Sequence, residues 1–186
     1  MNNPPRFPEA FETERLLIRA KRPGDGMEVY EAVRESLPEL SQWMSWAQQL
    51  ETPEAYEARA RMSAENFHRY EDMPFGLHRR SDQYLVGTCG VHLRDADVPS
   101  YEIGYWVRSS CSGSGYITEA VKALTARTFE HLGANRVEIR CDAANVRSAA
   151  VAERCGYTLE ARLRNHRRNI QGELADTLIF TKLKSS

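Results

Sequence analysis

Residues 110–120, SCSGSGYITEA, constrain the fold more than any other stretch of this sequence. Two glycines and several small hydroxyl or thiol residues separate an apolar run, YEIGYWV (101–107), from a segment with helical spacing. Small side chains offer little surface for packing, so the backbone of this loop is free for another use. A loop at the start of a helix presents N–H groups without intrahelical partners, and such groups bind anions. The order of strand, glycine loop and helix therefore predicts an anion-binding turn.

The segments after the loop predict how the chain continues. Residues suited to a buried helix face recur every three or four positions: Ile117, Val121, Leu124, Thr128 and Leu132. Gly133 is a typical helix end, and RVEIRCD (136–142) then alternates as a strand. Two neighbouring strands that are joined through a helix run parallel. This region therefore predicts a single parallel strand–helix–strand unit.

The remaining segments predict mainly antiparallel strands and further helices. Alternation and turn residues predict strands at 15–21, 74–80, 84–95, 101–108, 157–170 and 173–183. Helices are expected at 26–36, from Thr52-Pro53 to about residue 70, and at 146–155. The fold class is thus α/β (α+β), with a mixed sheet that is antiparallel early and has one parallel step. The sequence has no internal repeat, low-complexity tract or linker, which predicts one domain over residues 1–186.

Composition excludes several functional classes. The 25 Lys and Arg residues against 26 Asp and Glu residues give a net charge of −1, so general nucleic-acid binding has no electrostatic basis. No apolar run approaches the roughly 18 residues that a membrane span needs. The start, MNNPPRFPEAFETER, lacks the apolar core of a secretory signal. We therefore expect a cytoplasmic protein without a membrane partner.

Cysteines and histidines form no recognisable disulfide or metal pattern. The four cysteines are widely spaced, at Cys89, Cys111, Cys141 and Cys155. None of the five histidines has a ligand partner at metal spacing, so no metal is expected. Reduced and mostly buried thiols are the expectation. Cys111 is the thiol of most interest because it lies in the glycine loop.

The glycine loop has three other interpretations. Gly113-Ser114-Gly115 begins a dinucleotide fingerprint, but Thr118 occupies the third glycine position and only a short stretch follows Asp142. A P-loop would need a Gly-Lys-Ser/Thr sequence that is absent here. A purely structural turn is the third interpretation. The strand–loop–helix order favours an anion site over this structural turn, because its exposed N–H groups form a concave surface.

Three stretches, in this order, resemble the central motifs of the GNAT acetyltransferase superfamily: YEIGYWV, SGSGYITEA and NVRSAAVAERCGY. Three more are similar to its RimJ/RimL-like branch, which includes enzymes that acetylate protein N-terminal amines: ETERLLIR, LSQWMSW and GELADTLIFTKL. The resemblance extends from Thr13 to Leu183. It implies the GNAT fold, with about four helices around a sheet that is splayed at the parallel step, and an acyltransferase that uses acetyl-CoA.

The resemblance also implies where acetyl-CoA would bind. Its diphosphate would lie on the loop and helix start, at Ser112, Gly113, Ser114, Gly115, Tyr116, Ile117 and Thr118. Its pantetheine arm would enter a wedge between the strands 101–108 and 136–142, near Trp106, Val107 and Asn145. The family loop usually begins with Gln or Arg, where this chain has Ser110. Arg108 and Arg147 are the nearest cations that would compensate.

Acetyl transfer needs a neutral amine, a stabilised oxyanion and a proton for the leaving thiolate. Glu102 is the candidate base, because it shares a strand face with Trp106 and the family places an acid on this strand. Its alternative role is a sheet-edge charge or a structural pair with an arginine. Ala152 replaces the tyrosine that serves as the acid in many family members. The resemblance therefore assigns hydrogen bonding of the thiol to Ser148, whose alternative is a plain helix-start residue.

Two further regions are candidates for contact with the acceptor. Trp43 and Trp46 would wall the acceptor cleft, or else form a core plug. The basic run 162–168 is either the solvated face of a hairpin or a surface for an acidic acceptor. Direct transfer in a ternary complex is expected, because nothing near Cys111 supplies the base that a cysteine-linked intermediate needs.

The predicted acceptor is the α-amine of a peptide or protein N-terminus, and the enzyme is a monomer or homodimer. Two alternatives stay open at this point. One is an acetyltransferase for a small amine such as an amino acid, polyamine or antibiotic. The other is a non-catalytic acetyl-CoA-binding module.

Overall fold

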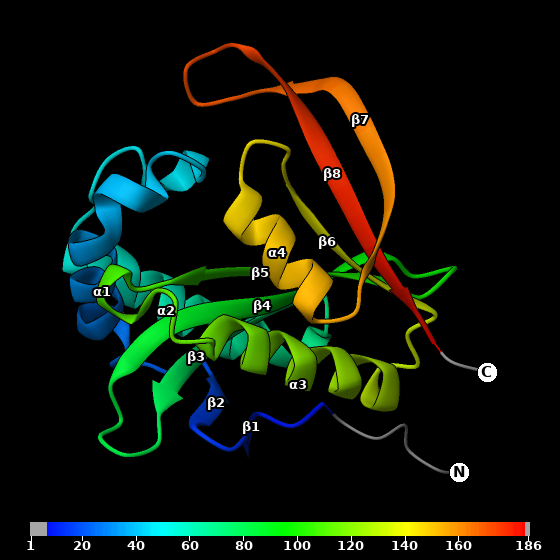
Figure 1. Cartoon of the computed structure of the whole chain (residues 1–186). Helices are drawn as coiled ribbons and strands as arrows, with labels where there is room; N and C mark the ends of the chain where they lie inside the picture. Colours follow the sequence, from blue (N-terminus) through cyan, green and yellow to red (C-terminus); the bar gives the residue numbers. More distant parts are fainter. Residues whose placement is uncertain (1–6, 185–186) are drawn as a thin grey trace, which may run out of the picture.

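The computed structural model describes residues 7–184, which form one eight-stranded sheet flanked by helices (Figure 1). The strands are β1 (Ala10–Glu12), β2 (Leu16–Ala20), β3 (Asp72–Arg79), β4 (Leu85–Asp95), β5 (Ser100–Val107), β6 (Arg136–Asp142), β7 (Thr158–Arg168) and β8 (Leu174–Leu183). The α-helices are α1 (Gly26–Leu40), α2 (Pro53–Asn66), α3 (Tyr116–His131) and α4 (Val146–Arg154). Short 3-10 helices cover Ser45–Ala47, Phe67–Arg69 and Ser109–Cys111.

The strand pairing confirms the predicted mixed sheet. The strand order is β1-β2-β3-β4-β5-β6-β8-β7, and every neighbouring pair is antiparallel except β5 and β6. These two strands pair only through Ser100–Glu102 and Arg136–Glu138. Beyond that point β6 stays with β8 as far as Asp142, and the β5 and β6 ribbons diverge in Figure 1. The sheet is therefore split beyond Glu102, as the family resemblance implied.

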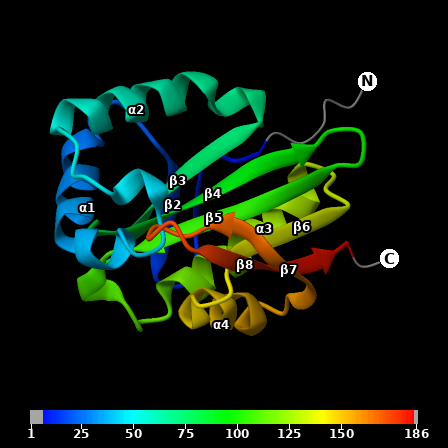
Figure 2. The same cartoon turned by 90° about the horizontal axis from the view of Figure 1, so that it is seen from above.

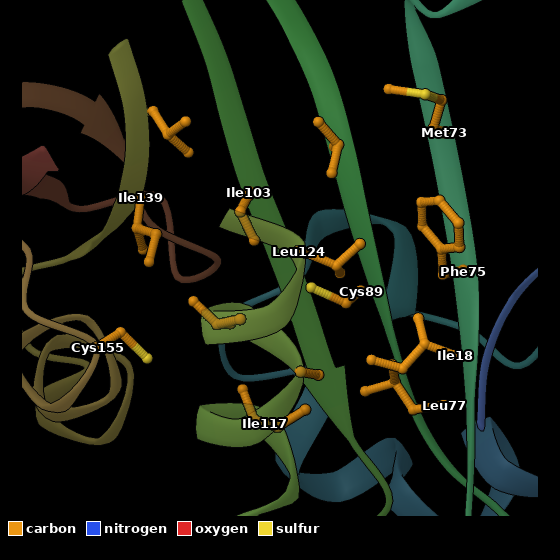
Figure 3. Packing of buried hydrophobic residues seen from close by; sticks show 14 of the residues in the cluster. Ile18, Met73, Phe75, Leu77, Cys89, Ile103, Ile117, Leu124, Ile139 and Cys155 are labelled. Atoms are coloured by element: carbon orange, nitrogen blue, oxygen red, sulfur yellow. The ribbon is translucent and has the colours of Figure 1, made fainter. Parts of the chain in front are cut away.

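The helices cover opposite faces of the sheet. Seen from above, α1 and α2 lie on one side, and α3 and α4 on the other (Figure 2). The main core forms under α3, where alternate strand residues meet the apolar helix face (Figure 3). Its members include Phe75, Cys89, Ile103, Ile139, Ile117 and Leu124. Because strand side chains alternate, the intervening residues of the same strands face the other side of the sheet.

Local differences from the sequence-based elements have simple causes. Helix α1 continues past residue 36 to Leu40 and includes Pro38. Proline lacks an N–H group, so the carbonyl oxygen of Arg34 loses its intrahelical donor, and the helix ends two residues after Pro38. The sequence analysis missed β1, which has three residues and adds an edge strand by pairing Phe11 with Ile18. A strand of this length carries too little alternation to be recognised.

A buried ionic cluster lies at the start of α1. Arg19 donates hydrogen bonds of 2.7 and 2.9 Å to the two carboxylate oxygens of Asp25. Lys21 is 8% exposed, and its Nζ has no hydrogen-bond partner within residues 7–184. Burial lowers the pKa of Lys21 to about 8, although the charge of Asp25 acts in the opposite direction.

Lys21→Met is expected to raise the free energy of unfolding at pH 7 by about 1–3 kcal/mol, because it removes an unpartnered buried ammonium group. The lysine pKa is about 8 in the folded state and 10.5 without the protein environment, so the unfolded state binds more protons between these values. The buried ammonium of Lys21 therefore destabilises the wild-type fold fully below pH 8, and this destabilisation decreases as the pH approaches 10.5. Urea unfolding of both proteins at neutral and alkaline pH measures this difference. An equal gain at both pH values would contradict a charge-based cause.

Candidate active site

A cleft of about 530 Å³ occupies the split between β5 and β6. Glu102, Gly104 and Trp106 line it from one face of β5, and Tyr105 lines it from the other, so the cleft reaches through the sheet. Its other walls include Thr88, Gly90, His92, Arg140, Cys141, Asp142, Asn145, Ser148, Trp43, Met44, Trp46, His166 and Arg167. The split sheet thus brings both candidate catalytic residues, Glu102 and Ser148, into one cleft.

The glycine loop leads directly into α3 with its N–H groups exposed. Gly113 and Gly115 have φ angles of 78° and 81°, a left-handed conformation that favours glycine. Ser112 and Ser114 donate their N–H groups back to carbonyl oxygens of the loop, so their exposed hydroxyls are what they can offer to a ligand. The N–H groups of Gly113, Gly115 and residues 116–118 have no acceptor within the described residues. Helix α3 is 16 residues long, and this end therefore has free donors and a positive dipole.

Arg15 is a cation beside this loop that the sequence analysis missed. Its Nη1 donates a 2.9 Å hydrogen bond to the carbonyl oxygen of Ser114, and its guanidinium lies 4.7 Å from the ring centre of Tyr116. Its Nε also pairs with Glu119 at 2.7 Å. Nothing in the local sequence signals this contact, because Arg15 lies 99 positions before Ser114. The Arg15 side chain is 43% exposed, so it lies at the surface beside the loop although it is paired with Glu119.

Arg108 was predicted to supply that missing charge, and the structure corrects this. Its guanidinium is buried, 4.3 Å from the ring centre of Tyr84, and its Nε lies 3.4 Å from Glu35. A buried and already paired cation is not available to an anion on the exposed loop. Arg147 is exposed and has no ion pair within residues 7–184, so it keeps its predicted role.

Glu102 faces the cleft and is also paired with arginines. Its Oε2 accepts hydrogen bonds from Arg94, the one from Nε being 2.9 Å long, and lies 3.7 Å from Nε of Arg140. The side chain is only 15% exposed. The structural pairing that sequence analysis left as an alternative is therefore real, and it occupies one carboxylate oxygen. The other oxygen, Oε1, has no hydrogen bond within residues 7–184 and is the one that can meet a ligand.

Ser148 lies in the first turn of α4 and contacts a residue that sequence analysis did not assign. Asn145 caps the helix by accepting from the N–H of Ser148 at 3.1 Å. The Ser148 hydroxyl lies 3.0 Å from the hydroxyl of Tyr105 on β5. Burial raises the pKa of Tyr105, so its hydroxyl keeps its proton and can donate to Ser148. The strand alternation in YEIGYWV placed Tyr105 opposite Glu102 but gave no sign of its partner.

The aromatic segment after α1 forms one wall of the cleft. Trp43, Met44 and Trp46 all line it, and the Trp46 ring lies 6.2 Å from that of Trp106 at a tilt of 54°. Trp46 is 42% exposed, which is too open for a core plug. Met44 instead packs against the small core between α1 and α2.

The basic run of the C-terminal hairpin is divided between the cleft and the solvent. His166 and Arg167 line the cleft, where Arg167 pairs with Asp142 at 2.7 Å. Arg162 pairs with Asp176 at 2.7 Å, and Arg164 is exposed. Within residues 7–184 no cluster of three His, Cys, Asp or Glu side chains has the arrangement of a metal site. None of the helices described there is both long and apolar enough for a membrane crossing.

The family of acetyltransferase (GNAT) domains matches residues 15–158, which contain the glycine loop and both strands of the split. The chain belongs to this family. It is therefore an acyltransferase of the GNAT type, which transfers acetyl groups from acetyl-CoA to nitrogen.

Named relatives and solved structures agree with this GNAT assignment. A Bacillus subtilis (strain 168) relative named ribosomal N-acetyltransferase YdaF is 30% identical over 154 residues, which are 82% of this chain and 82% of the relative. The ribosomal-protein-serine acetyltransferase of Escherichia coli (strain K12) is 24% identical, over 82% of this chain and 84% of its own length. RimL, an L7/L12 α-N-protein acetyltransferase solved with coenzyme A, has a TM-score of 0.84 at 20% identity and covers 96% of this chain and 97% of its own. The RimL comparison supports the fold.

The GNAT site of this chain has the features that acetyl-CoA requires. The unpaired edge of β5 beyond Glu102 leaves backbone groups free for an extended arm. The free N–H groups at the start of α3 suit a diphosphate, and the cleft extends from the split toward the aromatic wall. When bound, acetyl-CoA supplies the activated acetyl group, and the protein contributes position and charge.

Proposed function

We propose that this GNAT acetyltransferase acts on the α-amine of a peptide or protein N-terminus, by direct transfer in a ternary complex. The observation that carries the proposal is the shared cleft, in which Glu102, Ser148 and the tryptophan wall surround the split between β5 and β6. The names of the YdaF and serine acetyltransferase relatives support a ribosomal or protein acceptor. The proposal includes one domain over residues 1–186, working in the cytoplasm as a monomer or homodimer.

The proposed coenzyme site begins at the glycine loop. Gly113, Gly115 and the N–H groups of residues 116–118 would hold the diphosphate, with Ser112 and Ser114 adding hydroxyls and Arg15 and Arg147 adding charge. Trp106 and Val107 border the unpaired edge of β5, where the pantetheine arm would pair with the backbone. Asn145 lies at the inner end of this path because it caps α4 beside Ser148.

On the acceptor side, Glu102 would meet the incoming amine through its free oxygen, directly or through water. Trp43 and Trp46 would contact the first residue of the peptide. Ser148, supported by Tyr105, would hydrogen-bond the sulfur as the C–S bond breaks. This division places the negative charge at the amine and the hydroxyl at the leaving thiolate, which are the two positions where the reaction needs them.

Ser148→Ala is expected to leave acetyl-CoA affinity nearly unchanged and to lower kcat by roughly ten- to a thousandfold, the usual range for one catalytic hydrogen bond. Thiol release measures kcat, and calorimetry measures affinity. Tyr105→Phe is the matched variant, because it removes the hydroxyl partner of Ser148 and leaves Ser148 in place. We expect it to have a smaller effect in the same direction. Wild-type turnover after Ser148→Ala would leave Ser148 as a helix-start residue only.

The proposed function is tested by thiol release from acetyl-CoA with a panel of acceptors. The panel contains peptides with free N-termini, the same peptides with blocked N-termini, free amino acids and polyamines. Activity that depends on a free peptide N-terminus would support the proposal. Activity on free amino acids or polyamines alone would support a small-molecule acetyltransferase. Acetyl-CoA binding with no transfer to any amine would indicate a non-catalytic binding module.

A further inference from the structure

A second titratable group faces the acceptor cleft beside Glu102. His92 on β4 lines the cleft and is the direct cross-strand neighbour of Glu102 on β5. On its other side, His92 is paired in register with Asp72 on β3. Cross-strand neighbours project from the same face of a sheet. Asp72, His92 and Glu102 therefore form one polar row across three strands.

Asp72 fixes the tautomer of His92. Nδ1 of His92 lies 2.8 Å from Oδ1 of Asp72, and this contact holds the pKa of Asp72 below its usual range. A carboxylate accepts only, so in the neutral imidazole Nδ1 carries the proton and Nε2 keeps its lone pair. Nε2 has no hydrogen-bond partner within residues 7–184. The free lone pair belongs to a side chain that is 37% exposed, so a proton taken there can leave to solvent.

The imidazole of His92 lies against two glycines that line the cleft, Gly90 and Gly104. A side chain at Gly90 would place its Cβ 2.7 Å from Nε2, which no real contact allows. A Cβ at Gly104 would lie 3.4 Å from the same nitrogen. Nε2 therefore lies over the backbone of Gly104, two residues along β5 from Glu102 and beyond the point where β5 and β6 separate. That is where the proposed function brings the thioester and the amine together.

Glu102 and His92 differ in which side-chain atoms remain free for the acceptor amine. Arg94 and Arg140 lie beside Oε2 of Glu102, so only Oε1 is left to accept a hydrogen bond from the amine. His92 instead keeps a ring nitrogen with a free lone pair on the cleft side, and imidazole is the side chain that serves most often as a general base.

We propose that His92, oriented by Asp72, is the general base that deprotonates the acceptor amine, while Glu102 holds that amine in place. This step rests on the proposed function of the same cleft. Nε2 takes one proton from the bound ammonium, and the neutral nitrogen then forms the C–N bond as the C–S bond breaks. The second proton of that nitrogen goes to the leaving thiolate, which departs as the free thiol. His92 returns its proton to solvent, so one proton is released per acetyl group transferred.

His92→Gln is expected to lower kcat for a peptide acceptor by about 100- to 1000-fold, the range of a lost general base. It is also expected to abolish the acidic limb of the kcat–pH profile and to leave the acetyl-CoA affinity unchanged by calorimetry. Asp72→Asn keeps the imidazole and an oxygen that can accept from its Nδ1–H but removes the negative charge, so kcat should fall about tenfold and the limb should move to lower pH. His68→Gln is the control, because that side chain is 58% exposed and lies outside the cleft lining.

The acidic limb of the kcat–pH profile also depends on the charged groups that surround His92. The ionisable groups around His92 are Asp72 on β3, Arg94 on β4, Glu102 on β5, Arg140 on β6, and Arg69 near Asp72. A folded His92→Gln protein with wild-type kcat, or with reduced kcat and an unchanged limb, would overturn the role of His92. If that variant does not fold, an unshifted limb in Asp72→Asn would overturn it instead. If the wild type acetylates a peptide and His92→Gln does so with the same kcat, only the role of His92 is refuted. If the wild type transfers acetyl to no amine, the proposed function is refuted as well.

Discussion

Gly115→Val is expected to weaken acetyl-CoA binding by about 100-fold or more, which is roughly 2.7 kcal/mol. Gly115 is the N-cap of α3 and has a φ angle of 81°, which a β-branched residue adopts only with strain. A Cβ there would lie 3.4 Å from Nη2 of Arg15, an ordinary contact, so the strain comes from the backbone conformation. The backbone must therefore shift where the free N–H groups converge, and the anion site loses its geometry. Calorimetric titration with acetyl-CoA measures the loss.

Gly172→Val is the matched control for this variant. Gly172 has a φ angle of 82° and lies in the turn between β7 and β8, where an added Cβ would meet no atom within 4 Å beyond its chain neighbours. Both substitutions should therefore lower the melting temperature through similar backbone strain. Only Gly115→Val should lower affinity for acetyl-CoA. Unchanged affinity in a folded Gly115→Val protein would remove the glycine loop from the coenzyme site.

An α-amine is expected to be preferred over a lysine side chain by at least about 100-fold in kcat/KM. At pH 7 the lysine pKa near 10.4 leaves roughly 200–500 times less neutral amine than an α-amine pKa of 7.7–8.0. The site has limited means to recover this difference. One oxygen of Glu102 is already occupied by Arg94, and Arg140 places a second positive charge within 4 Å. A site built this way favours an amine that loses its proton readily.

The measurement compares one peptide in two forms at pH 7. In the first form the N-terminus is free and the lysine is acetylated, and in the second form the reverse holds. The matched sequence keeps the contacts of Trp43 and Trp46 comparable, and an acidic second residue tests whether the basic run 162–168 contributes. A preference for the lysine form would overturn the acceptor assignment. Raising the pH should narrow the gap, because the neutral fraction of lysine grows faster than that of the α-amine.

Short-range patterns were sufficient for the framework of the site. The glycine loop, the helical spacing after it and the alternation in 136–142 predicted the β5–α3–β6 unit, and the structure confirms it as the parallel step of the sheet. The alternation of YEIGYWV also predicted that Glu102 and Trp106 lie on one face of the strand and Tyr105 on the other. These features depend on residues that lie close to one another along the chain. Their periodicity fixes which face a side chain occupies, whatever it later contacts.

The contacts that give the site its chemistry depend on strand pairing and packing. The register of β3, β4 and β5 places Asp72, His92 and Glu102 in one row, although they are separated by up to 30 positions along the chain. Arg15 reaches the glycine loop from a position 99 residues before Ser114. Arg108, adjacent to that loop in sequence, is buried beside Tyr84 instead.

The sequence by itself determined the order of helices and long strands from β2 onward, the glycine turn and the faces of the strands, because each is encoded by local spacing and backbone preference. Only the tertiary structure decided that β5 and β6 part after Glu102, that Tyr105 supports Ser148, and which charges pair. These outcomes depend on the register of the whole sheet and on competition among many charged groups for few buried positions. No local pattern records that competition, since the energy of each ion pair is set by neighbours that the fold brings together.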